Sequence, residues 1–168
     1  MRIAVAADHR GFEAKRKLLP LLKQMGHEAE DFGCDGTSNA TDYPDYAIPA
    51  AKAVAEGKCE AGIFLDGSGI GMSVAANKVR GIRAALAHDE VTARLSREHN
   101  HCNVLCLGSD LLNENEIRKI ISVFLTTPFG EGRHARRVEK LKQFEEEEQG
   151  KGGAGEWGGG GVGQPPAA

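Results

Sequence analysis

Short runs of apolar residues alternate with helical patterns along most of the chain. The apolar runs predict five strands, and stripes of apolar residues at helical spacing predict six helices between or after them. The strands are expected at residues 2–8, 28–33, 61–66, 82–88 and 103–107, and the helices at 11–25, 45–56, 72–79, 90–99, 115–126 and 134–148. This alternation is typical of an α/β protein.

The predicted strands are largely apolar along their whole length and do not alternate between apolar and polar residues. Such strands are typical of a parallel sheet that helices cover on both faces. The expected fold is therefore an α/β three-layer sandwich with a five-stranded parallel sheet, Rossmann-like in architecture. Ligands of such sheets bind beyond the carboxyl ends of the strands, which directs attention to residues 8–10, 66–69, 88–89 and 108–110.

The end of the chain has a different composition from the rest. Residues 150–168 contain nine of the chain's 22 glycines. A segment of this composition cannot bury a hydrophobic core. We expect a folded domain at residues 1–148 and a disordered, glycine-rich tail at residues 149–168.

Charge and hydropathy exclude two kinds of partner. The chain has 21 Lys and Arg against 24 Asp and Glu, a formal net charge of −3, so it lacks the basic field of a nucleic-acid-binding protein. No run approaches the roughly 20 apolar residues of a membrane span, and no secretory leader precedes the first strand. We expect a cytoplasmic protein with a small-molecule ligand, with no nucleic acid and no membrane as partners.

The four cysteines predict neither a disulfide framework nor a metal site. Cys34, Cys59, Cys102 and Cys106 occur singly, without a CxxC pair. A zinc site at His99, His101 and Cys102 is not expected, because neighbouring residues point in different directions. We expect four reduced thiols and no bound metal.

A glycine-rich segment after the strand at 61–66 gives the strongest chemical signal. Its residues are Gly67, Ser68, Gly69, Ile70 and Gly71. The glycines let successive backbone N–H groups face one anion, but their spacing is neither a dinucleotide fingerprint nor a P-loop, so no nucleotide cofactor is implied. Two interpretations of the preceding Asp66 stay open: a base beside the anion site, or a cap of the turn and the following helix.

Two further segments carry side chains suited to substrate chemistry. His99 lies at a helix end, where a histidine can move protons near neutral pH; the alternative is an ordinary surface cluster. Arg133 and Arg137 are four residues apart and share one face if a helix begins there, which suits a phosphate group. The alternative is a solvated basic stretch that pairs with the acidic run at 145–148.

Seven segments together resemble one known family. They are residues 7–11 (ADHRG), 41–45 (TDYPD), 67–71 (GSGIG), 75–79 (AANKV), 81–84 (GIRA), 96–100 (SREHN) and 132–134 (GRH). In this order, over about residues 1–145, they resemble the ribose-5-phosphate isomerase B family, which also includes galactose-6-phosphate isomerase subunits.

The resemblance implies metal-free aldose–ketose isomerisation of a sugar phosphate through a cis-enediolate, without a cofactor. The expected reaction converts ribose 5-phosphate to ribulose 5-phosphate. Two alternatives stay open: a non-catalytic sugar-phosphate binding protein, and an isomerase of another aldose phosphate. Family members are homodimers whose active sites are shared between subunits, and further assembly to a tetramer stays open.

The resemblance also implies roles for individual residues. Asp66 is the candidate base, and His99 would assist opening of the sugar ring. The residues expected to bind the sugar are Asp8, His9, Gly67, Ser68, Gly69, Ile70, Gly71 and Asn100. The residues expected to bind the phosphate are Arg133, His134 and Arg137, together with His9.

Two positions depart from the family pattern. Many members have a cysteine base at position 66 and another branch uses a glutamate at position 72, whereas this chain has Asp66 and Met72. A partly desolvated aspartate is a stronger base than an exposed one, so Asp66 can replace the cysteine. The family commonly has an arginine at position 110, and Asp110 would weaken phosphate binding there.

Overall fold

The computed structural model describes residues 1–36 and 39–151. Its strands are β1 (Arg2–Ala7), β2 (Glu28–Asp31), β3 (Ala61–Asp66), β4 (Ala84–Leu86) and β5 (Val104–Gly108). Its helices are α1 (Phe12–Gln24), α2 (Pro44–Ala55), α3 (Ile70–Ala76), α4 (Glu90–Asn100), α5 (Glu114–Thr126) and α6 (Arg133–Lys151). These elements match the predicted order of strands and helices.

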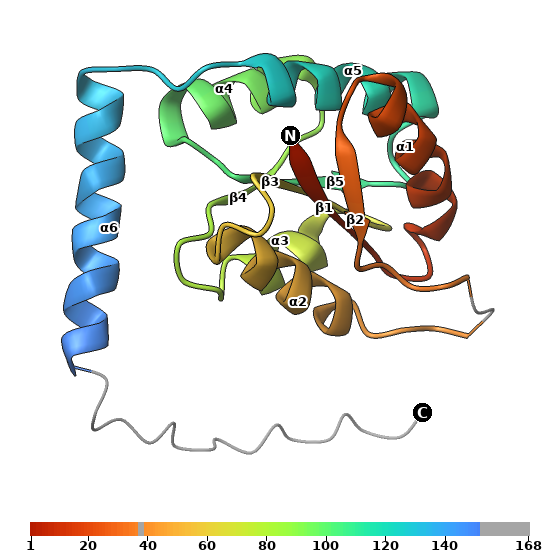
Figure 1. Cartoon of the computed structure of the whole chain (residues 1–168), viewed down its shortest axis with the longest axis horizontal. Coiled ribbons are helices and arrows are strands. Elements are labelled where there is room, and N and C mark those ends of the chain that lie inside the picture. Colours follow the sequence, from red (N-terminus) through yellow and green to blue (C-terminus); the bar gives the residue numbers. More distant parts are fainter. Residues whose placement is uncertain (37–38, 152–168) are drawn as a thin grey trace, which may run out of the picture.

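The five strands form one sheet in the order β2-β1-β3-β5-β4, and every neighbouring pair is parallel. Alternate residues of the strands face opposite sides, as in any sheet. Ile63 and Leu65 join the core under α1, α4 and α5, whereas Phe64 joins the core with α2 and α3. The predicted three-layer sandwich around a five-stranded parallel sheet is confirmed (Figure 1).

The edge strand β4 is shorter than predicted. The apolar run predicts a strand over 82–88, but only Ala84–Leu86 pair with β5. Before the strand, the side chain of Asn103 accepts from Arg83 N at 2.9 Å; after it, His88 N donates to Thr92 Oγ1 at 3.2 Å near the start of α4. Side-chain hydrogen bonds of this kind compete with the ladder for backbone groups and end the strand at both sides.

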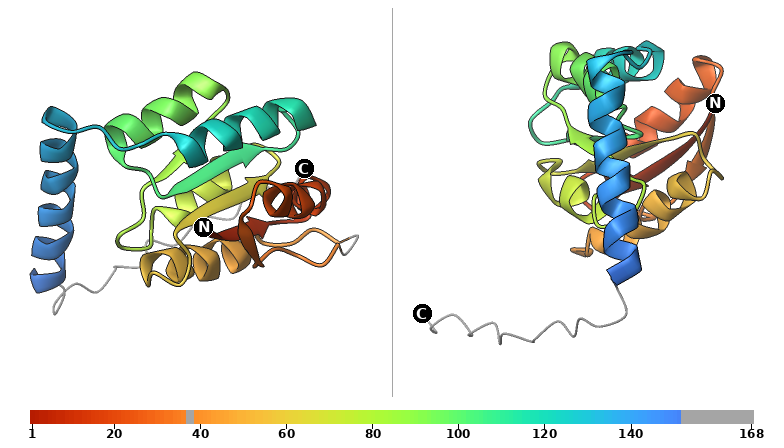
Figure 2. Two further views of the ribbon diagram at one scale, coloured as in Figure 1. Left: turned by 45° about the horizontal axis from the view of Figure 1, so that its top comes forward. Right: turned by 90° about the vertical axis from the view of Figure 1, so that its left-hand side faces the viewer.

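Helix α6 stands beside the sandwich and not in one of its layers (Figures 1 and 2). It contacts α4, and the backbone N–H of Gly81 donates to the Glu145 carboxylate at 3.3 Å. Leu141 and Phe144 on this helix are 51% and 61% exposed. The helix runs to Lys151, past the boundary predicted at residue 148, and the predicted tail beyond it lies outside the described residues. Among the described helices, none combines the length and the apolar character that a bilayer span requires.

Candidate functional site

The order of the strands reverses between β1 and β3, and two carboxylates lie at this point. From β1 the chain proceeds to β2 on one side, and β3 pairs with β1 on the other side. Asp8 follows β1 and Asp66 ends β3; both are buried, at 6% and 4% exposure. Ligands of α/β proteins bind beyond the carboxyl ends of the strands at a switch point of this kind.

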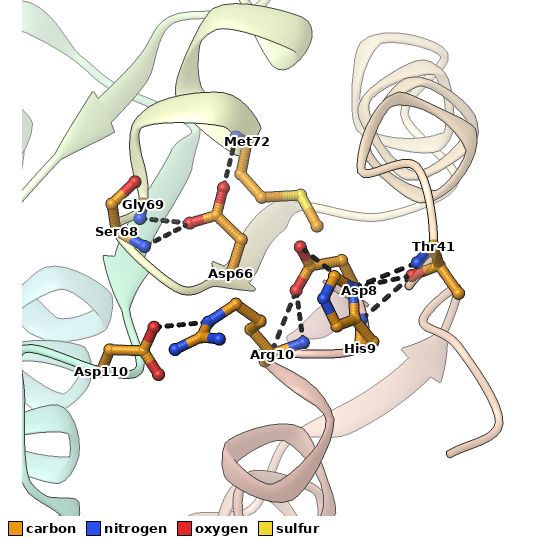
Figure 3. Close-up of polar contacts among 10 residues, drawn as sticks. Asp8, His9, Arg10, Thr41, Asp66, Ser68, Gly69, Met72 and Asp110 are labelled. Atoms are coloured by element: carbon orange, nitrogen blue, oxygen red, sulfur yellow. Dashed lines mark hydrogen bonds and ion pairs between the residues drawn. The ribbon is translucent and has the colours of Figure 1, made fainter. Parts of the chain in front are cut away.

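The Asp66 carboxylate is surrounded by the N–H groups of the glycine-rich loop (Figure 3). Oδ1 accepts from Ser68 N at 3.1 Å and from Gly69 N, and Oδ2 accepts from Met72 N at 3.1 Å. Gly69 has φ +80°, a conformation that favours glycine and turns the loop around the carboxylate. Asp66 therefore caps its own loop, which is one of the two interpretations that the sequence leaves open.

This arrangement limits which amides of the loop can face a substrate oxyanion. Ser68 N and Gly69 N of the loop, together with Met72 N of α3, donate to Asp66, and substrate binding by residues 67–71 stays a prediction. The carboxylate satisfies these donors itself because a side chain at this place reaches the concave face of the loop. The loop's contribution to any chemistry thus includes the orientation of Asp66.

Asp8 and His9 are fixed by the turn between β1 and α1. Asp8 Oδ1 accepts from Arg10 N at 2.9 Å and from Gly11 N at 3.0 Å, which is an Asx-type turn. Thr41 binds His9 twice: His9 N donates to Thr41 Oγ1 at 3.0 Å, and Thr41 N donates to His9 Nδ1 at 3.1 Å. Because Nδ1 accepts a hydrogen bond, the neutral ring carries its proton on Nε2.

Arg10 and Asp110 form an ion pair over the loop (Figure 3). Arg10 Nε lies 2.6 Å from Asp110 Oδ2. This hydrogen bond, and then the charge of the same carboxylate, raise the pKa of Arg10. The sequence predicts that the negative charge of Asp110 weakens phosphate binding; in the structure that charge is paired with Arg10. Arg10 received no role from the sequence, although it directly follows the first strand and has the charge opposite to that of Asp110.

A second group of predicted residues lies elsewhere in the fold. His99 and Asn100 are the last residues of α4, and Arg133, His134 and Arg137 belong to the first turns of α6. The rings of His99 and His134 stack with centroids 4.1 Å apart and planes at 4°. Loss of hydration, followed by the neighbouring His99 and the two arginines, lowers the pKa of His134.

The two groups lie at opposite edges of the sheet within one chain. Gly108 of β5 pairs with Asp66 at the carboxyl edge, whereas Val104 pairs with Gly62 at the other end of the same strands. His99 and Asn100 lie just before Val104 in the sequence, so they belong to the amino edge. We name Asp8, His9, Asp66 and residues 67–71 the carboxyl-edge group, and His99, Asn100, Arg133, His134 and Arg137 the amino-edge group.

The four cysteines are buried, and three have altered acidity. Burial raises the pKa of the Cys102 thiol to about 11. Burial, followed by the charge of Glu30, raises that of Cys59 to about 11. Burial, and then Asp66, raise the pKa of Cys106 well above its ordinary value. Thiols of this kind are poor nucleophiles at neutral pH. Within residues 1–36 and 39–151, no three His, Cys, Asp or Glu side chains are grouped as metal ligands.

Comparison with known proteins identifies the family. Residues 3–141 match the family model described as Ribose/Galactose Isomerase. The chain is 41% identical to the ribose-5-phosphate isomerase B of Mycobacterium leprae over 150 residues, which are 89% of this chain and 93% of the relative.

Solved structures agree with the sequence comparison. Ribose-5-phosphate isomerase B of Clostridium thermocellum has a TM-score of 0.85 at 42% identity, over 88% of this chain and 99% of that chain. The enzyme of Mycoplasma genitalium with bound ribulose-5-phosphate has a TM-score of 0.84 at 39% identity, over 87% of this chain and 97% of that chain. On these matches, the chain belongs to the ribose/galactose isomerase family.

Proposed function

We propose that this protein interconverts ribose 5-phosphate and ribulose 5-phosphate. The observation that carries the proposal is the similarity to the Mycoplasma genitalium enzyme that holds ribulose-5-phosphate, with a TM-score of 0.84 over 87% of this chain. In the reaction, a base removes the proton from C2 of the open-chain aldose, an enediolate forms, and the base returns a proton to C1 after partial exchange with solvent. The hydroxyl proton of O2 passes to O1, so atoms and charge balance.

Asp66 is the base in this proposal, and Oδ2 is the atom that takes the proton. Each carboxylate oxygen has two lone pairs. Oδ1 accepts from two backbone N–H groups, whereas Oδ2 accepts from Met72 N and keeps a second lone pair. A Cβ on Gly71 would lie 3.0 Å from Oδ2 and 3.1 Å from the Tyr43 ring, so any side chain at position 71 would crowd the carboxylate. The amide hydrogen bonds then aim the base before substrate arrives.

The same hydrogen bonds favour one alternative function. A carboxylate held by three N–H groups can be a purely structural cap, and the protein would then bind a sugar phosphate without turning it over. Exchange of the C2 proton of ribose 5-phosphate with deuterated water separates the two functions, because a binding protein has no means to exchange it.

We further propose that the active site is shared between two subunits of a homodimer. His99 would assist ring opening, and Asn100, Arg133, His134 and Arg137 would bind sugar and phosphate, yet all lie at the edge opposite Asp66. Ile70 and Val74 beside the glycine-rich loop are 57% and 51% exposed. These apolar side chains, one turn apart on α3, are the surface that a second copy would cover.

An activity assay with ribose 5-phosphate, other pentose phosphates, and tetrose and hexose phosphates tests the proposed reaction. We expect formation of ribulose 5-phosphate, together with deuterium at C1 or C2 when the solvent is deuterated. Binding of ribose 5-phosphate without conversion or exchange would refute the isomerase and support the binding protein. Conversion of another aldose phosphate in preference would correct the substrate alone.

Mixed dimers test the shared site. Asp66→Asn and His99→Asn are each expected to be inactive alone, because every site then lacks one group. Co-expression in equal amounts forms mixed dimers in which one site carries both changes and the other carries neither, so about a quarter of wild-type activity should return. Sites built within single chains would give no recovery.

A further inference from the structure

A phosphate bound at the carboxyl-edge group would lie close to several negatively charged carboxylates. Asp8 and Asp66 are buried carboxylates at the carboxyl ends of the adjacent strands β1 and β3, and Asp110 follows the neighbouring strand β5 by two residues. A sugar phosphate brings further negative charge into this surrounding. Cationic groups must therefore face the phosphate, and Arg10 is a guanidinium already present among these carboxylates.

One of the three guanidinium nitrogens of Arg10 holds the side chain in place. Nε donates to Asp110 Oδ2 at 2.6 Å. The pair lies directly against the start of the glycine-rich loop, because a Cβ on Gly67 would meet Asp110 Oδ2 at 2.6 Å and Arg10 Nε at 3.0 Å. Figure 3 shows Arg10 between Asp110 on one side and the turn at Asp8 on the other.

Asp110 is itself held in place by the backbone. Asp110 N donates to Gly67 O at 3.1 Å, and the adjacent Ser109 N donates to Asp66 O at 2.8 Å. The backbone that carries the Asp110 carboxylate is thus fixed relative to the same loop that positions Asp66. An arginine bound through Nε keeps its planar fork of two terminal nitrogens, which suits two oxygens of one phosphate. The Arg10 side chain is 58% exposed, so that fork is accessible.

We propose that Arg10 binds the phosphate group of the substrate and that Asp110 is the positioning residue that holds its guanidinium beside Gly67. The inference rests on the proposed function, since it needs a phosphorylated ligand at this edge of the sheet. It adds a phosphate-binding residue that the sequence motifs did not indicate. It also explains how a carboxylate at position 110 is tolerated near a phosphate, because the ion pair with Arg10 neutralises the charge of that carboxylate.

Three variants test the proposal. Arg10→Ala alone leaves Asp110 unpaired, so the informative variant is Arg10→Ala with Asp110→Asn, which removes the pair without a net change of charge. We expect it to raise KM for ribose 5-phosphate about tenfold while kcat changes less than about threefold, as for a lost phosphate contact. Arg10→Ala with Asp110→Arg returns a guanidinium to this place and should recover most of that affinity.

Arg16→Ala is the matched control. Arg16 is an exposed arginine of α1 whose ion pair with Glu13, at 3.0 Å, lies on the outer surface of the helix. Its removal should leave KM and kcat unchanged. A wild-type KM in the Arg10→Ala/Asp110→Asn variant would overturn the proposal. So would an equal loss of affinity for unphosphorylated ribose, since that would mark a merely structural role.

Calorimetric titration with inorganic phosphate separates this proposal from the isomerase reaction. The wild-type protein should bind phosphate, and Arg10→Ala/Asp110→Asn should bind it about tenfold more weakly, whether or not turnover occurs. Weaker phosphate binding in a protein without isomerase activity would support Arg10 and refute only the reaction. Unchanged phosphate binding in an active enzyme would refute only Arg10.

Discussion

The carboxyl-edge and amino-edge groups are built in different ways. Asp8 and Asp66 are buried at 6% and 4% exposure, and backbone N–H groups of adjacent turns hold both carboxylates. The side chain of His99, by contrast, is 37% exposed, and Arg133 and Arg137 are exposed on a helix outside the three layers. The core of the sandwich thus fixes one group within a single chain, whereas the geometry of the other depends on how α6 packs against α4 and, in our proposal, against a second subunit.

Removal of the charge at Asp66 should have the largest effect. Asp66→Asn keeps an oxygen for Ser68 and Gly69 but turns an NH₂ group toward Met72 N, which is a donor. We expect kcat for ribose 5-phosphate to fall about a thousandfold, the range of a lost general base. The measurement is steady-state kinetics, with circular dichroism to verify folding. Asp35→Asn, at an exposed position, gives the matched charge change and should be neutral. A rate within tenfold of wild type would assign Asp66 to structure alone.

Added bulk at Gly69 should reveal how tightly the carboxyl-edge loop is packed. Gly69→Ala places a Cβ against Leu86 Cδ1 and 3.0 Å from the Leu107 carbonyl carbon at φ +80°. We expect a loss of about 3 kcal/mol in the free energy of unfolding, from backbone strain plus overpacking.

Gly81→Ala is the control for this loss. Gly81 has φ +79°, but a Cβ there meets nothing within 4 Å. Chemical denaturation should give a cost of only about 1 kcal/mol, which is the strain alone. Equal costs at the two positions would contradict the tight packing of the loop.

Loss of the α6 arginines should weaken substrate binding but leave the fold intact. Arg133 and Arg137 are exposed, so their replacement exposes no core. We expect Arg133→Ala/Arg137→Ala to raise KM for ribose 5-phosphate about thirtyfold with an unchanged melting temperature. Arg136→Ala, on the same helix, is the control for charge. Similar KM values for the double variant and this control would remove α6 from phosphate binding.

The smallest expected effect is a change in the pH dependence of stability caused by His101, which follows α4. Burial, followed by the charges of Arg83, Arg97 and Lys142, lowers the pKa of His101 below 6.5. The unfolded chain therefore takes up this proton at a higher pH than the folded one, and stability is lost as pH falls below 6.5 through the folded pKa. His101→Asn, which tolerates the φ of 49° at this helix end, should show a shallower fall of melting temperature between pH 7.5 and pH 5. Equal slopes for variant and wild type would exclude His101 as a source of the pH dependence.

The sequence predicts the sandwich well because its strands are continuous apolar runs between clear helical stripes. The strand over 61–66 is found at the predicted residues, since both of its faces are buried. The strand over 82–88 is overestimated, because side-chain hydrogen bonds from distant residues such as Asn103 decide where an edge strand ends. The spacing of apolar residues along the chain carries no information about such contacts.

The candidate site was only partly predictable for a similar reason. Residues that follow strands, such as Asp8 and Asp66, are placed at the carboxyl edge by the α/β topology alone. The ion pair of Arg10 with Asp110 joins positions 100 residues apart in the chain, and no local pattern indicates it. Whether Asp66 faces the substrate or its own loop depends on side-chain geometry, which spacing does not specify.

The short strand β4 has a consequence for the behaviour of the protein at high concentration. An uncovered sheet edge invites another strand to pair with it, which leads to aggregation. On β4, the side chain of Asn77 bonds both the N–H and the carbonyl of Ala84, each at 2.9 Å. At the opposite edge, β2 has the sequence Glu-Ala-Glu-Asp, in which Glu30 and Asp31 form ion pairs with Arg2 and Lys15, and charged side chains on an edge strand disfavour pairing with another strand. On β4, the Asn77 side-chain amide thus occupies backbone groups that another strand would need, and β2 carries charged side chains. Both edges of the sheet therefore disfavour pairing with further strands and growth into fibres.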